Sequence, residues 1–102
     1  MSHLTEAQQD LRRQLNSETA KIAWTDLQSH FARGVVFAVA TNMDLVEVAA
    51  YLAEDQQEQA QTWQAAGQLA TVSDEQAQQW FDEQQVLWAV VVKPWILVQP
   101  IE

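Results

Sequence analysis

Residues 86–98, VLWAVVVKPWILV, decide the fold class. The run is rich in β-branched and aromatic side chains and shows no polar alternation, which is typical of strands buried on both faces. Lys93 and Pro94 interrupt it. The interruption predicts a hairpin, with one long strand bulged at Pro94 as the alternative, and proline at the later turn position would require a cis bond. The choice matters because Trp88 and Trp95 are an odd number of positions apart, so in one continuous strand their side chains would point to opposite faces of the sheet.

A second apolar run, GVVFAVA at residues 34–40, predicts another strand that is covered on both faces and lies in the middle of the sheet. Gly34 is placed to end a preceding helix over 26–33, because glycine readily adopts the left-handed backbone of a helix stop. Asp44 with Glu47 forms a capping-box pattern that predicts a helix over 45–54.

Helical spacing and short apolar runs predict the remaining elements, which are helices over 4–16, 56–66 and 74–84 and a short strand over 69–72. Three further capping patterns support the helix starts: Thr25 with Gln28, Asp55 with Glu58, and Ser73 with Gln76. Residues 17–24 fit either a strand or an extension of the first helix. The whole indicates an α+β fold, in which a small, mostly antiparallel sheet of three to four strands packs with about five helices.

Length and charge limit the functions to consider. A chain of 102 residues with 48% hydrophobic residues predicts a single domain over 1–102, with residues 1–3 frayed. The net charge of -9 argues against binding nucleic acid or an anionic membrane surface, both of which require clustered Lys and Arg. The N-terminal residues lack the pattern of a signal peptide, so we expect a cytoplasmic protein.

Residues with catalytic potential are sparse. The chain has no cysteine, and its two glycines are too far apart for a phosphate-binding loop. Asp26 and His30 stand four residues apart and share a helix face, but catalytic zinc sites use three protein ligands. The carboxylates Asp55, Glu58, Asp74 and Glu75 fall at predicted helix starts, where negative charge is favourable. We therefore predict no catalytic residue, no metal site and no cofactor.

Five tryptophans are the most unusual feature of the composition. Indole rings concentrate in cores, binding pockets and interface hot spots, and core packing is the first expectation here. If any of these residues belongs to a ligand or partner surface, we expect it to be Trp24, Trp88 or Trp95. Arg33 joins them because cations are few in this chain.

The order of segments resembles a family of small bacterial proteins classed only as a domain of unknown function. The resemblance rests on residues 18–24 (ETAKIAW), 31–34 (FARG), 44–49 (DLVEVA) and 87–95 (LWAVVVKPW). It covers the chain from Leu11 to Gln99. It implies a bacterial, stand-alone, cytoplasmic protein and brings no activity, cofactor or catalytic residue.

The leading hypothesis is a small acidic, non-enzymatic module that binds a protein partner or a second copy of itself. One alternative is a small-molecule- or metal-dependent enzyme that uses acidic residues, with Asp26 and His30 as candidates. Another is an acidic mimic that occupies a basic site on a partner protein. Salt dependence, metal titration and partner capture would separate the three.

Overall fold

The computed structural model describes residues 4–101, and within them five helices and five strands follow one another along the chain. The helices are α1 (Glu6–Glu18), α2 (Trp24–Ala32), α3 (Leu45–Ala53), α4 (Gln57–Ala65) and α5 (Asp74–Asp82). The strands are β1 (Ala20–Ala23), β2 (Val36–Val39), β3 (Leu69–Thr71), β4 (Val86–Val92) and β5 (Trp95–Pro100). The predicted fraying of residues 1–3 lies outside the described part of the chain.

The strands form one sheet in the order β1-β4-β5-β2-β3, in which only β2 and β5 run parallel. The α+β prediction is confirmed, with five strands rather than three to four. The additional strand is β1, which settles the ambiguous residues 17–24: α1 continues to Glu18, and Ala20–Ala23 then pair with β4. The prediction that residues 34–40 form the middle strand is wrong in detail, because β2 is an interior strand beside the central β5.

The apolar run at 86–98 is a hairpin of β4 and β5, so the bulged-strand alternative is wrong. Val92 pairs with Trp95 across the turn, and the Lys93–Pro94 bond is cis. Trp88 pairs with Gln99, and the antiparallel register therefore places Trp88 and Trp95 on the same face of the sheet.

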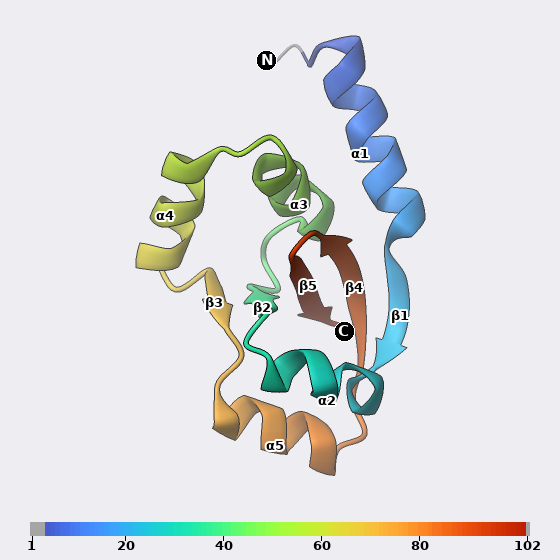
Figure 1. Cartoon of the computed structure of the whole chain (residues 1–102), viewed down its shortest axis with the longest axis vertical. Helices are drawn as coiled ribbons and strands as arrows, with labels where there is room; N and C mark the ends of the chain where they lie inside the picture. The colour runs from blue at the N-terminus through green and yellow to red at the C-terminus, as the bar shows by residue number, and fades with distance from the viewer. Residues whose placement is uncertain (1–3, 102) are drawn as a thin grey trace.

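Each face of the sheet carries its own hydrophobic core. Helices α1, α3 and α4 cover one face, where Leu45 and Val48 pack on Val90 and Leu97. Helices α2 and α5 cover the other face, with a separate set of buried side chains: Trp24, Leu27, Ala77, Trp80, Leu87 and Val98. Figure 1 shows α2 and α5 side by side at the end of the molecule opposite α1, α3 and α4. Successive side chains along β4 and β5 point to opposite faces of the sheet, and the same two strands therefore supply residues to both cores.

Two of the four helix starts predicted from capping patterns have the expected side-chain bonds. The Asp44 carboxylate accepts from the amides of Val46 and Glu47, and the Ser73 hydroxyl accepts from the Gln76 amide. The other two predictions are wrong. Helix α2 starts at Trp24, before Thr25, and α4 follows Gln56 without a side-chain cap. A capping box that the patterns missed joins Thr5 and Gln8 at the start of α1.

Candidate functional site

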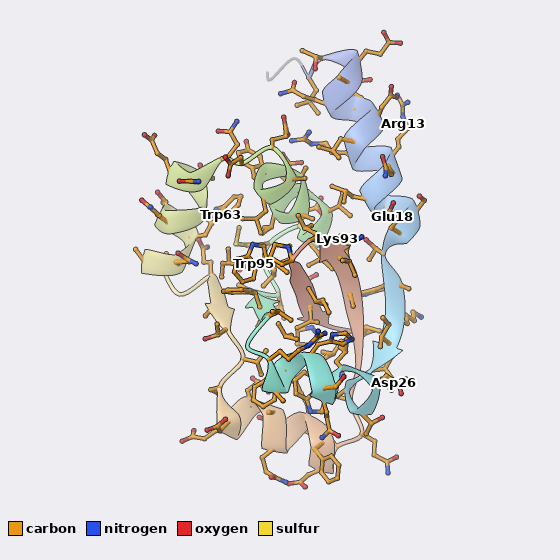
Figure 2. The ribbon with its side chains drawn as sticks, in the orientation of Figure 1. Arg13, Glu18, Asp26, Trp63, Lys93 and Trp95 are labelled. Atoms are coloured by element: carbon orange, nitrogen blue, oxygen red, sulfur yellow. The ribbon has the colours of Figure 1, made fainter. Side chains whose placement is uncertain are left out.

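Trp95 is the tryptophan with the most exposed ring surface among the predicted site residues. It is 38% exposed at the start of β5 and packs edge-on against Phe37, with ring centroids 5.1 Å apart and an interplanar angle of 86°. Figure 2 shows Trp95 on the side of β5 that faces α4 and β3. Beside it opens a cavity of about 180 Å³ whose walls are Phe37, Leu52, Gln64, Leu69 and Trp95. We call this feature the Trp95 cavity.

Trp88 lies on the same face of the sheet but lines a different hollow. The Lys21 ammonium stands 5.2 Å from the centre of its ring, within range of a cation–π contact. Trp88 and Gln99 form part of the wall of an open cavity of about 240 Å³ near the start of α3. The Gln99 amide donates to the carbonyls of Ala40 and Met43, both at 2.7 Å, and so fixes the loop before α3. The half-buried Trp88 is therefore mainly a packing residue that carries a cation over its ring.

Trp24 belongs to the core of the opposite face. Its side chain is 1% exposed and packs against Phe31 and Trp80, with ring centroids 5.4 and 5.1 Å away. Trp24 is therefore first a core residue, and the expectation that it belongs to a partner surface stays a prediction. Its Nε1 has no hydrogen-bond partner among residues 4–101, which is unusual for a buried donor.

Arg33 caps the C-terminus of α2 and contacts Nδ1 of His30 through its guanidinium. Arg33 is exposed, follows the last residue of α2 on the opposite face of the sheet, and does not line the Trp95 cavity. His30 and Asp26 both line an open cavity of about 410 Å³ beside the exposed Val91. Within residues 4–101 no three His, Asp or Glu side chains group closely enough to hold a metal ion.

A surface that the sequence patterns missed lies where α2 meets α5. Two cavities, of about 630 and 410 Å³, open there, and both are lined by Trp24 and Phe81. We call the pair the Phe81 groove. Phe81 stands four residues after Ala77 and next to Trp80, a spacing that predicts a place on the buried face of the helix, yet its side chain is 48% exposed. The sequence holds only a weak signal for this exposure: Trp80 and Phe81 are adjacent and point about 100° apart around the helix, so one of the two falls at the margin of the apolar face.

The strongest ion pair of the described residues is structural. Arg12 of α1 donates to both carboxylate oxygens of Glu47 in α3, at 2.9 and 2.8 Å, and lies 3.6 Å from Glu54. The hydrogen bond from Arg12 lowers the pKa of Glu47, and the same bond raises the pKa of Arg12. This network lies between α1 and α3 and serves to hold these helices together.

Comparison with known proteins agrees with this architecture. The family model described as "Protein of unknown function (DUF2288)" matches residues 10–100. The chain belongs to the DUF2288 family. The family predicted from the sequence, a domain of unknown function, is thereby confirmed.

A solved relative shares the fold of this DUF2288 protein. The NMR solution structure of PA1075 from Pseudomonas aeruginosa is similar to it with a TM-score of 0.80 and 41% sequence identity, over 100% of this chain and 94% of that one. A comparison with the curated proteins gave no match. None of the described helices is long and apolar enough to cross a bilayer. Neither the family description nor the relative's title states an activity.

Proposed function

We propose that this DUF2288 protein is a small acidic interaction module that binds a protein partner through the Trp95 cavity. The observation that carries the proposal is the indole of Trp95, which is 38% exposed at the mouth of a mostly apolar cavity. Tryptophan in a part-exposed, preformed setting is the residue type most enriched at interface hot spots. A volume of about 180 Å³ suits one apolar side chain of a partner.

The setting of Trp95 supports a rigid binding surface. Its ring is held against Phe37 of β2, and the opposite wall comes from Leu52 of α3 and Gln64 of α4. Surfaces that are already formed lose little conformational entropy on binding. Gln64 supplies an amide at the rim, where hydrogen bonds give specificity. The partner is a different protein or a second copy of this chain, in a bacterial cytoplasm.

The test uses partner capture from the native bacterial lysate together with native mass spectrometry of the purified protein. We expect Trp95→Ala to weaken binding of the identified partner by roughly 30-fold, corresponding to about 2 kcal/mol for a tryptophan hot spot. Gln64→Arg, which adds a charge at the rim without touching the core, should weaken binding as well. Mass spectrometry distinguishes a second copy from a different protein.

Val86→Ser provides the matched control, because Val86 is 41% exposed and does not line the Trp95 cavity. This variant should bind as the wild type does. The proposal is wrong if the wild type is strictly monomeric and the capture profiles of Trp95→Ala, Gln64→Arg and Val86→Ser are all the same as its own.

A further inference from the structure

The Phe81 groove combines aromatic surface and negative charge in a way that the Trp95 cavity does not. It lies at the end of the molecule formed by α2 and α5 (Figure 1). Its two cavities meet at Phe81, whose side chain is 48% exposed, and Trp24 lies beneath them. An exposed phenyl ring beside open space offers its electron-rich face to a cation.

The charge around the groove is negative. Asp82 lines the larger cavity and Asp74 the smaller one, while none of the described residues that line either cavity is Lys or Arg. The Gln78 amide donates to Asp82 at 2.9 Å, and the Gln79 amide donates to Glu83 at 2.8 Å. Both donors are neutral amides, so these hydrogen bonds bring no cation to either carboxylate.

The position of Asp82 and Glu83 strengthens this negative field. They occupy the last turn and the C-cap of α5, where the helix dipole is already negative and where no basic residue is present. Carboxylates at this end of a helix are unfavourable for its stability, and a cation bound there is favourable. The chain's own Lys and Arg side chains lie elsewhere: Arg12 and Arg13 in ion pairs, Lys21 over Trp88, Arg33 at His30, and Lys93 in the turn between β4 and β5.

The opposite wall of the larger cavity is the start of α2. Ala23 is its N-cap and offers no side-chain hydrogen bond, and the Trp24 amide is used by the carbonyl of Gln85 at 2.9 Å. The positive end of this helix favours an acceptor oxygen rather than a cation. The groove thus presents a cation-binding wall at Asp82 and an acceptor-binding wall at Thr25.

We infer that the Phe81 groove binds an arginine or lysine side chain of a partner protein. The cation lies over the Phe81 ring next to Asp82, and Glu83 adds negative charge one residue further along the chain. A main-chain carbonyl of the same segment faces the start of α2. Charge complementarity selects this occupant over a second copy, because a chain with a net charge of -9 would bring like charges together. The inference rests on the proposed function in one respect only, namely that the partner is a protein.

The test is an NMR titration of the full-length, ¹⁵N-labelled protein with a short capped peptide that carries one arginine between two leucines. A peptide with citrulline in place of arginine has nearly the same shape without the charge. We expect shifts at Phe81, Asp82, Gln84 and the Trp24 indole with the arginine peptide, and binding weaker by roughly threefold or more with the citrulline peptide.

Two variants locate the site. Phe81→Ala removes the ring, and the double variant Asp82→Asn with Glu83→Gln removes two charges; each should weaken binding of the arginine peptide by roughly threefold or more. The matched control is Asp55→Asn with Glu58→Gln near the start of α4, which removes the same charge elsewhere and should have no comparable effect.

Equal binding of the arginine and citrulline peptides would overturn the inference, as would equal losses in the two double variants, which would indicate unspecific attraction to an acidic protein. Peptide-induced shifts confined to residues outside the groove would overturn it too. Because the peptide is added directly, these results do not depend on the capture experiment with Trp95→Ala. Failure at one surface is therefore distinguishable from failure at the other.

Discussion

At the scale of single residues, Arg12 shows how an acidic chain uses a scarce cation. Its side chain is 13% exposed, pairs with Glu47 through both oxygens, and has its guanidinium carbon 6.0 Å from the centre of the Tyr51 ring. With Glu54 at 3.6 Å as well, this one residue of α1 lies against three positions of α3 and its C-cap. A bidentate, partly buried pair of this kind is worth more than an isolated surface pair, since its geometry is fixed.

The Arg12–Glu47 pair predicts a specific dependence of stability on pH. Because the folded pKa of Glu47 lies below its ordinary 4.5, the pair stabilises the fold above about pH 4.5, and this contribution disappears as the pH falls through the lowered pKa. Glu47→Gln should lower the free energy of unfolding at pH 7 by less than about 1 kcal/mol, because the Glu47 side chain is 41% exposed and screened. Urea denaturation at pH 7 and pH 3 measures this difference.

The difference between wild type and Glu47→Gln should shrink at pH 3. Asp10→Asn serves as the control, since the side chains of Asp10 and its partner Arg13 are 62% and 69% exposed and their pair should contribute little at either pH. A loss in Glu47→Gln that stays constant from pH 7 to pH 3 would contradict the assignment to the charged pair.

At the scale of elements, four helices end in the same way. In α2 the Gly34 amide donates to the carbonyl of Phe31, and the next amide donates to His30; α3, α4 and α5 repeat this pair of bonds. The arrangement is a Schellman motif, which requires a left-handed residue after the C-cap. That residue is a glycine in two of the helices, Gly34 after α2 and Gly67 after α4. It is Asp55 after α3, with a φ of 59°, and Gln84 after α5, with a φ of 51°.

The helix ends therefore predict opposite effects for two substitutions. Gln84→Gly should raise the free energy of unfolding by up to about 1 kcal/mol, because glycine adopts a positive φ without the steric cost that glutamine has. Gly34→Ala should lower it by roughly 1–2 kcal/mol. A Cβ at Gly34 would meet nothing within 4 Å, so the cost is conformational alone. Urea denaturation measures both, and a destabilised Gln84→Gly protein would contradict the interpretation of the helix ends.

The same elements show what the sequence can predict. Apolar runs identified β2, β4 and β5, because strands covered on both faces leave a continuous pattern. The strand β1 was ambiguous, since Ala20 and Lys21 are exposed and its residues suit a helix equally well; its strand form depends on pairing with β4. Thr25 has the residue type of a cap, but the amide of Trp24 donates to the carbonyl of Gln85, and α2 begins two residues earlier than that cap requires.

At the scale of the whole molecule, the candidate surfaces depend on contacts between distant segments. Trp95 could be singled out from composition, but the cavity beside it combines residues of β2, α3, α4 and β3, which no local pattern brings together. The Phe81 groove likewise requires α2 and α5 to lie side by side across about 50 residues of sequence. Composition therefore indicated which residue types to examine, whereas the sheet order determined where they meet.

The sheet also joins the two cores into one unit, and this predicts how the protein unfolds. Leu45 of α3 and Leu27 of α2 are 5% and 3% exposed and lie in the cores on opposite faces, yet both cores include residues of β4 and β5. Leu45→Ala and Leu27→Ala should each cost about 2–5 kcal/mol. Because alternate residues of the same strands form both cores, each variant should lower hydrogen-exchange protection on both faces by the same amount. Loss of protection in α3 of Leu45→Ala with unchanged protection in α2 would show that the two faces unfold independently.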